Sequence, residues 1–112
     1  MEFISHDKIK LPTLKELGID ADGLFGDILQ TPGEGPMTCG FFRMNSPGSF
    51  DFDYTYEEYK VVLEGEFKIS DNKGNEFVGK PGDFFHFQDG DKITFDTNSS
   101  GLAFYVSQRE KE

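Results

Sequence analysis

The stretch EYKVVLEGEFKIS, residues 58–70, and the turn KPGD, residues 80–83, decide the fold of this chain. The first stretch holds two short apolar runs separated by Glu64-Gly65-Glu66. Glycine readily adopts the positive φ that a sharp reversal requires, and Pro-Gly-Asp is typical of a tight turn. The two stretches therefore predict a pair of short β-strands and a further strand that begins soon after residue 83.

The same alternation of short apolar runs and turn residues continues over most of the chain. Strands are predicted at residues 24–29, 37–44, 50–56, 58–64, 66–70, 76–78, 84–87, 93–96 and 102–108, and a single helical turn is predicted at residues 14–17. Short strands separated by turns rich in Gly and Pro are typical of a sandwich or barrel. We therefore predict an all-β jelly-roll barrel.

Length and composition fit one domain with a small aromatic core. The chain has 112 residues, of which 36% are hydrophobic and 15% aromatic, with 13 phenylalanines and no tryptophan. Each phenylalanine buries a large apolar area, so a small number of side chains can stabilise the core. We expect residues 1–23 to form an N-terminal arm or irregular segment and residues 24–112 to form the barrel domain.

The charge of the chain argues against two classes of partner. Acidic residues number 21 against 11 basic ones, which gives a net charge of −10 at pH 7. Nucleic acids and anionic membrane surfaces are bound through Lys and Arg, so neither is an expected partner. The N-terminus lacks the basic start and apolar run of a signal peptide, and no stretch has the length of a membrane span. We therefore expect a cytoplasmic protein.

Several residues and their spacing resemble the sequence motifs of the cupin superfamily, a group of small jelly-roll barrels. They are Glu58, Gly65, the pair Gly82-Asp83, and Gly90. Cupins commonly hold a metal ion through histidines in these motifs, but no histidine stands at the matching positions here. Those positions fall on Phe52 and Tyr54, or on Asp51 and Asp53, and on Ile93. Imidazole is a usual ligand of Fe, Mn, Ni and Zn. The resemblance thus implies the barrel, and the missing histidines predict no tightly bound metal and no cofactor.

Within the superfamily, the chain is similar to the cupin domain of the ethanolamine utilisation protein EutQ. The similar stretches lie within residues 37–108: Tyr56-Glu57-Glu58, residues 62–66, residues 80–83 and Phe104-Tyr105-Val106. That family likewise lacks the histidines and has isoleucine at the position of Ile93. The resemblance implies a role in ethanolamine catabolism or its bacterial microcompartment, with microcompartment proteins as partners, and an acetate kinase activity. The sequence has no Gly-rich phosphate loop followed by Lys-Ser/Thr, which would support a kinase.

Strand alternation gives the candidate site. If Glu58 points into the barrel, as the resemblance implies, then alternate side chains share its face. These are Phe52, Tyr54, Tyr56, Lys60 and Val62. Buried charges persist when they are paired, so Glu58 and Lys60 are predicted to form an ion pair and are the candidate catalytic residues, with Glu58 able to move a proton. Lys60, Tyr54 and Tyr56 would bind a small anionic metabolite. The alternative is that Lys60 reaches the barrel mouth and the tyrosines only pack in the core.

Two further residues are candidates for ligand binding. Arg43, the only arginine inside the region expected to fold, suits bidentate recognition of an anion, although an arginine on a strand can equally form a surface ion pair. His86 lies on a core strand, and histidine titrates near neutral pH, so it could act as an acid or base in the pocket. Its alternation with Phe85 and Phe87 leaves open which face it occupies, and a structural or surface histidine is the other interpretation.

The opposite face of the same strands is also apolar, at Tyr59, Val61, Leu63 and residues 84–87. A half-buried strand would alternate apolar with polar residues, so a second copy of the chain is expected to cover this face in a homodimer. Three functions stay open: a EutQ-like cupin that binds a small anionic metabolite, a non-catalytic ligand-binding or assembly cupin, and an isomerase or lyase with Glu58 as general base. Whether the protein is an enzyme stays open with them.

Overall fold

Nine β-strands form the body of the protein in a computed structural model, which describes residues 1–111. The strands are β1 (Gly23–Gln30), β2 (Met37–Met44), β3 (Gly48–Asp53), β4 (Glu58–Gly65), β5 (Phe67–Asp71), β6 (Glu76–Gly79), β7 (Phe84–Phe87), β8 (Lys92–Thr97) and β9 (Gly101–Gln108). One 3₁₀ turn, η1 (His6–Lys8), precedes them, and residues 1–111 contain no α-helix. The described residues include no helix that is long and apolar enough to cross a membrane.

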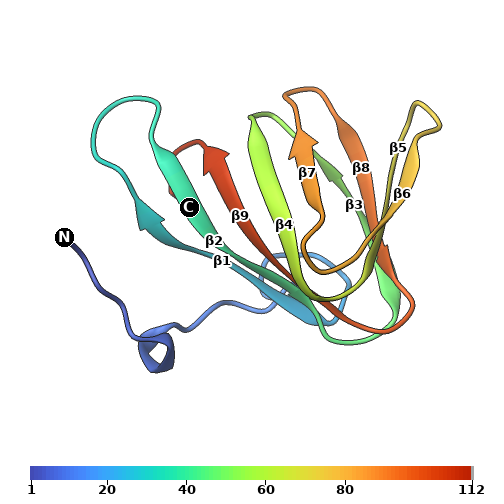
Figure 1. The fold of residues 1–112 in the computed structure, drawn as a ribbon, viewed down its shortest axis with the longest axis horizontal. Helices are drawn as coiled ribbons and strands as arrows, with labels where there is room; N and C mark the ends of the chain where they lie inside the picture. The colour runs from blue at the N-terminus through green and yellow to red at the C-terminus, as the bar shows by residue number, and fades with distance from the viewer. Residues whose placement is uncertain (112) are drawn as a thin grey trace.

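The strands pair into two antiparallel sheets that enclose the core (Figure 1). The five-stranded sheet has the order β1-β2-β9-β4-β7, and the four-stranded sheet has the order β3-β8-β5-β6. Neighbours within a sheet come from distant parts of the chain, as where β9 lies between β2 and β4. The predicted all-β barrel is confirmed, and each predicted strand is present with small shifts at its ends.

The largest of these shifts is at the end of β3, because the chain changes sheet there. The sequence predicts a strand up to residue 56, but β3 ends at Asp53 and β4 begins at Glu58 in the other sheet. Tyr54 fixes the crossing: its N–H donates to the carbonyl of Asp91, and its own carbonyl accepts from the N–H of Gly90, both at 2.8 Å. The chain therefore passes from one sheet to the other within the run predicted to line the barrel.

Aromatic rings fill the space between the sheets. Phe42 on β2 is 2% exposed, and the centroid of its ring lies 5.8, 5.3 and 5.2 Å from those of Phe50, Phe67 and Phe95. Phe42 belongs to the five-stranded sheet, whereas its three ring partners belong to the four-stranded sheet. Aromatic pairs at these distances stabilise beyond the area they bury. The core thus joins the two sheets through ring contacts, as the composition predicts.

The segment before β1 packs against the barrel. Thr13 forms an isolated β-bridge with Leu24. The predicted helical turn follows as a single turn, in which the N–H of Leu17 donates to the carbonyl of Leu14 at 3.0 Å. Leu14 is almost completely buried and belongs to the hydrophobic core. This part of the N-terminal segment therefore forms a piece of the barrel wall.

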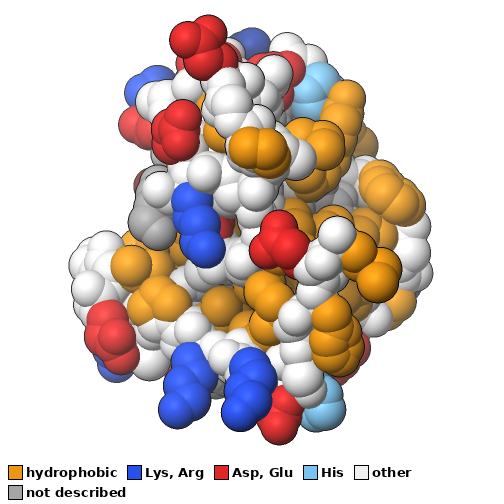
Figure 2. Space-filling view, turned by 90° about the vertical axis from the view of Figure 1, so that its left-hand side faces the viewer, with side chains coloured by type: hydrophobic (Ala, Val, Ile, Leu, Met, Phe, Trp, Pro, Cys, Tyr) orange, Lys and Arg blue, Asp and Glu red, His pale blue; other side chains and the backbone are white. Residues whose placement is uncertain are grey.

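The outer face of the five-stranded sheet carries hydrophobic side chains that reach solvent. Along β2, buried residues alternate with Cys39, Phe41 and Arg43, which are less buried. On β4 and β7, Tyr59 and Phe84 are 59% and 76% exposed. Hydrophobic side chains also reach the surface on the side that lies to the left in Figure 1, with charged side chains among and around them (Figure 2). The second apolar face predicted for these strands is present.

Candidate functional site

A cavity of about 180 Å³ lies inside the barrel. Leu14, Leu17 and Ile19 from the N-terminal segment line part of it, and phenylalanines from both sheets line the rest. The polar lining residues are Tyr54, Tyr56, Glu58 and Lys60. A mainly apolar wall with a few converging polar groups is typical of a small-molecule site.

The structure brings these four polar residues together as the alternation predicts. Burial alternates through the crossing between sheets: Tyr54 and Glu58 are buried, whereas Thr55 and Glu57 are exposed. Tyr54 is also fixed by its ring, which stacks on Phe87 with centroids 4.7 Å apart. Alternate side chains thus keep facing the interior although the chain passes from one sheet to the other. The roles of these residues in binding or catalysis stay predictions.

Glu58 and Lys60 form a buried ion pair. Lys60 Nζ lies 3.0 Å from Glu58 Oε2, and the two side chains are 4% and 1% exposed. Tyr54 Oη donates to the same oxygen at 2.6 Å, and Ser107 Oγ donates to Oε1 at 2.7 Å. Both oxygens of the carboxylate therefore have partners, which a buried charge requires.

Tyr54 is held as a neutral hydrogen-bond donor. Burial raises the pKa of Tyr54 well above its ordinary value, and the negative charge of Glu58 and the hydrogen bond to it raise it further. Lys60 Nζ in turn donates to Tyr54 Oη at 3.4 Å. The amine, the phenol and the carboxylate are thus in mutual contact, so a proton can pass among them without a bridging water.

Aromatic rings surround the Lys60 ammonium on its other sides. Nζ lies 4.7 Å from the ring centroid of Phe95, 4.8 Å from Phe42, 5.5 Å from Phe87 and 5.6 Å from Tyr105. The faces of aromatic rings carry partial negative charge and attract a cation within about 6 Å. The rings and Glu58 together replace the water that the ammonium loses on burial.

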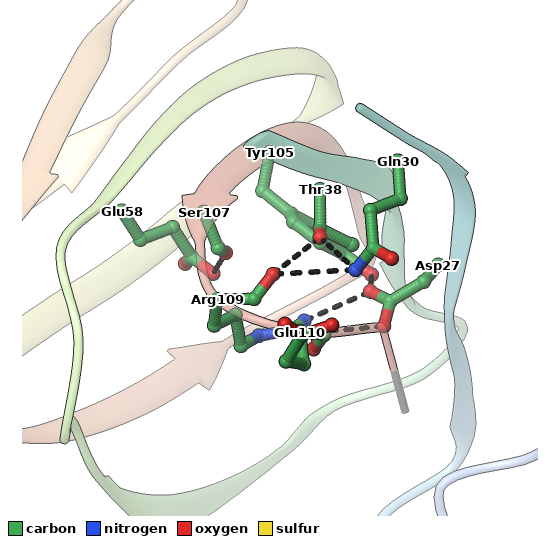
Figure 3. A network of polar contacts seen from close by, with 8 residues as sticks. All are labelled: Asp27, Gln30, Thr38, Glu58, Tyr105, Ser107, Arg109 and Glu110. Atoms are coloured by element: carbon green, nitrogen blue, oxygen red, sulfur yellow. Dashed lines mark hydrogen bonds and ion pairs between the residues drawn. The ribbon is translucent and has the colours of Figure 1, made fainter. Parts of the chain in front are cut away.

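A second buried ion pair lies at the end of β9, between Asp27 and Arg109 (Figure 3). Arg109 Nη1 and Nη2 donate to the two carboxylate oxygens of Asp27, both at 2.8 Å, and Tyr105 Oη donates to Oδ1 at 2.6 Å. The arginine and aspartate side chains are 9% and 2% exposed. Gly40 leaves room for the Tyr105 hydroxyl, because a Cβ at Gly40 would lie 2.5 Å from it.

The Asp27–Arg109 pair contacts one of the residues that line the cavity. Arg109 Cζ lies 5.0 Å from the ring centroid of Tyr56, which lines the cavity. Burial opposes the charge of Arg109, but its hydrogen bonds and charge contacts with Asp27 and Tyr56 raise its pKa overall. Thr38 Oγ1 donates to the carbonyl of Arg109 at 2.5 Å and ties the backbone to β2. Arg109 thus holds the end of the chain beyond β9 against the barrel.

Arg109 belongs to the folded region, so the expectation that Arg43 is the only arginine there is wrong. Arg109 follows the last predicted strand, where a basic residue is usually solvated, so the sequence does not single it out. The one available signal was Asp27, a charged residue inside the apolar strand GLFGDILQ. Its alternation with Phe25 places it on the inner face, where a carboxylate needs a cationic partner.

Arg43 and His86 lie away from the cavity lining. Arg43 Nη2 is 3.8 Å from Glu64 Oε1 in a partly exposed ion pair. His86 is exposed; its Nε2 lies 3.0 Å from Glu57 Oε1, and its ring centroid lies 4.9 Å from that of Tyr59. The open question of its orientation is settled in favour of the outer face, where a separate hollow of about 300 Å³ borders it. Neither residue lines the cavity that holds the Glu58–Lys60 pair, although the outer hollow beside His86 also borders Glu58.

The donor set in the cavity does not fit a transition-metal ion. Phe52 and Ile93, at positions where related barrels carry histidines, have no ligand atom, and the Glu58 carboxylate is already bound by an ammonium and two hydroxyls. Within residues 1–111, no group of three or more His, Cys, Asp or Glu side chains is placed to hold a metal ion. In this cavity the Lys60 ammonium is the cation that Glu58 neutralises.

Two facing antiparallel sheets around an internal cavity define a single-domain cupin barrel. Residues 31–102, more than half of the chain, match the family described as the EutQ-like cupin domain. The chain belongs to that family, which confirms the resemblance seen in the sequence. No curated protein matches the chain in sequence.

Solved structures agree with this assignment. An ethanolamine utilization protein Q (EutQ) from Salmonella typhimurium LT2 is 25% identical, with a TM-score of 0.79 over 95% of this chain and 84% of that one. The EutQ protein of Clostridium difficile is 18% identical, with a TM-score of 0.72 over 95% and 78% of the two chains. The polyketide cyclase RemF from Streptomyces resistomycificus is 20% identical, with a TM-score of 0.81 over 99% and 81%. The last two likenesses concern the fold alone.

Proposed function

We propose that this protein binds a small anionic metabolite with an apolar body inside the barrel. One observation carries the proposal: Lys60 is the only cation among the cavity-lining residues described in the structure, and only two of its partners described there are oxygen atoms. An ammonium has three N–H donors. Two of them meet Glu58 and Tyr54, so the third faces the aromatic rings and would turn to an oxygen of the ligand. The phenylalanine wall would hold the apolar body.

Glu58 is better suited to positioning Lys60 and exchanging a proton with it than to taking a proton from a ligand as a general base. Its two oxygens accept hydrogen bonds from Tyr54 and Ser107, and Lys60 lies beside them. A base would have to give up one of these partners before it could accept a proton from a ligand. The contacts therefore support ligand binding more directly than the isomerase or lyase alternative with Glu58 as general base.

The proposal extends to the metabolic pathway in which the protein acts. Membership of the EutQ-like family supports a role in ethanolamine utilisation, association with a bacterial microcompartment, and an acetate kinase-type activity. Formation of acetyl phosphate from acetate and ATP by the purified protein would test the kinase. If no acetyl phosphate forms, the non-catalytic cupin that binds a ligand or supports assembly is favoured.

A thermal-shift screen against small carboxylates and phosphates tests the binding. We expect a carboxylate with a short apolar chain to raise the melting temperature of the wild-type protein. The double variant Glu58→Gln/Lys60→Met should lose this effect, while Arg43→Met, which changes a charge outside the cavity, should keep it. A shift that survives the double variant and disappears in Arg43→Met would refute the cavity as the binding site.

We also propose that the outer face of the five-stranded sheet pairs two copies of the chain. The chain carries a net charge of −10, so two copies repel each other overall, and this repulsion opposes contact least where the surface carries no charge. The exposed Tyr59, Leu63 and Phe84 provide such a surface. Phe84→Lys should shift the mass measured by light scattering from dimer to monomer, whereas Phe77→Lys, on the other sheet, should not. A wild-type protein that is monomeric at micromolar concentration would refute the pairing.

A further inference from the structure

We propose that Lys60 forms a reversible imine with the carbonyl group of a small 2-oxo acid held in the cavity. This inference rests on the proposed function and deepens it, because a 2-oxo acid carries both the anionic group proposed there and a carbonyl next to it. Three features carry the inference: an amine that lines the cavity, proton-accepting and proton-donating groups beside that amine, and surroundings that stabilise the product.

The amine is placed where a bound carbonyl must meet it. Lys60 lines the cavity, yet its side chain is only 4% exposed to solvent. Lys68 and Lys92, which form ion pairs on the surface, are 46% and 61% exposed. A ligand held in a small cavity presents its reacting group at a high effective concentration. An amine in such a cavity is a suitable nucleophile for a carbonyl carbon.

The neighbours of Lys60 are the groups that imine formation needs. An ammonium must lose a proton before its nitrogen can attack, and Glu58 Oε2 lies 3.0 Å away to accept it. The loss of the negative charge on Glu58 also removes its repulsion against the carboxylate of the ligand. Tyr54 Oη, 2.6 Å from Glu58 Oε2 and 3.4 Å from Lys60 Nζ, links the two and can relay a proton.

The step balances without a further reagent. The neutral amine forms a C–N bond with the carbonyl carbon as the C=O double bond opens, and the attacking nitrogen passes one proton to the carbonyl oxygen to give a neutral carbinolamine. Glu58 then returns its proton to the hydroxyl group, the C–O bond breaks, and water leaves as the C=N bond forms. The sum is one ammonium and one 2-oxo acid giving one protonated imine and one water, with Glu58 again a carboxylate.

The site stabilises the product as well as the reactant. The protonated imine has the same single positive charge as the ammonium and lies at the same place, beside Glu58 and the rings of Phe42 and Phe95 at 4.8 and 4.7 Å. Stability alone gives a weak reason for such a pair, because well-packed apolar residues usually stabilise a core as well as a buried ion pair does. A chemical role for the amine explains why the pair borders a cavity.

Reductive trapping tests the inference on the full chain. The protein is incubated with 2-oxobutanoate and sodium cyanoborohydride, and peptide mapping by mass spectrometry locates the modified lysines. We expect Lys60 to be modified about tenfold faster than Lys68 or Lys92, a barrier difference of about 1.4 kcal/mol. Modification of Lys60 no faster than of these exposed lysines would overturn the inference.

Variants and a matched ligand separate this result from simple binding. Lys60→Arg keeps a cation but cannot form an imine, and Tyr54→Phe keeps the amine but removes the proton relay, so trapping at residue 60 should vanish in the first and slow in the second. 2-Hydroxybutanoate has the same carboxylate and chain without the carbonyl. If both ligands raise the melting temperature equally and Lys60 is not trapped, the imine is refuted and the binding function stands. If neither ligand raises it and Lys60 is not trapped, both proposals fail.

Discussion

The substitution Lys60→Met tests whether the buried ion pair stabilises the fold. Methionine has nearly the length of lysine without the charge, so the change removes the ammonium and leaves the packing largely intact. Glu58 then stays 1% exposed with the hydroxyls of Tyr54 and Ser107 but without a counter-charge. Removing one partner of a buried pair typically lowers the free energy of unfolding by about 3–5 kcal/mol. We expect a loss of that size.

The double variant Glu58→Gln/Lys60→Met should recover most of this loss. Glutamine keeps an oxygen that can accept from Tyr54 or Ser107, and no charge is left buried. Replacing both members of a buried pair by neutral groups of similar volume changes stability by about 1 kcal/mol or less in many proteins, and sometimes raises it. The double variant should therefore be more stable than either single variant.

Urea unfolding followed by circular dichroism and tyrosine fluorescence measures these differences, because the chain has no tryptophan. Lys68→Met serves as the control, since Lys68 and Glu76 form a pair of 3.9 Å that is about half exposed. An exposed pair contributes about 0–1 kcal/mol. If Lys60→Met loses no more stability than Lys68→Met, the reasoning about a desolvated pair in the barrel is refuted.

Three further outcomes are expected. Arg109→Met should lower the free energy of unfolding by about 3 kcal/mol because it removes the cation that balances the buried Asp27 carboxylate, whereas Arg43→Met should change it by less than about 1 kcal/mol; urea unfolding compares them. Gly40→Ala should lower it by about 3 kcal/mol or more, because its Cβ would lie 1.9 Å from the backbone carbonyl oxygen of Gly26 on β1 and 2.5 Å from Tyr105 Oη, and an unchanged urea midpoint would contradict these contacts. Burial and a carboxylate neighbour raise the pKa values of Tyr54 and Tyr105. The two neutral phenols therefore favour the folded state below the ordinary tyrosine pKa of about 10, and their contribution to the free energy of unfolding is lost as the pH rises above that value. An ultraviolet titration should therefore show these two tyrosines ionising only as the protein unfolds, and Tyr54→Phe should remove part of this late step alone.

The fold could be predicted because its determinants are local. Gly65 has a φ of 66° and Gly82 a φ of 95°, and each marks a reversal that the sequence shows directly. The apolar runs between such glycines are too short for anything but strands. The pairing of the strands could not be predicted in this way, since nothing local in β9 indicates that it pairs with both β2 and β4.

The candidate site could be predicted only where one continuous run supplies it. Tyr54, Glu58 and Lys60 lie within seven consecutive positions, so alternation alone places them on one face. Asp27 and Arg109 are 82 residues apart, and their meeting depends on the order of strands across the sheet. The orientation of His86 is likewise undetermined from the sequence, because Phe84 on its own face and Phe85 and Phe87 on the opposite face make both faces of β7 apolar. Contacts between distant strands are set by three-dimensional packing, which a single sequence does not display.

The position of β9 has a consequence for how the protein is made. All eight other strands precede β9 in the chain, yet β9 pairs with β2 on one side and β4 on the other. On the ribosome, these two partners emerge first, with the edges that face β9 unpaired. Unpaired strand edges bind other chains readily. The sheet therefore cannot assemble in the order of synthesis. A nascent chain interrupted before residue 101 would expose two unpaired strand edges that can bind other chains.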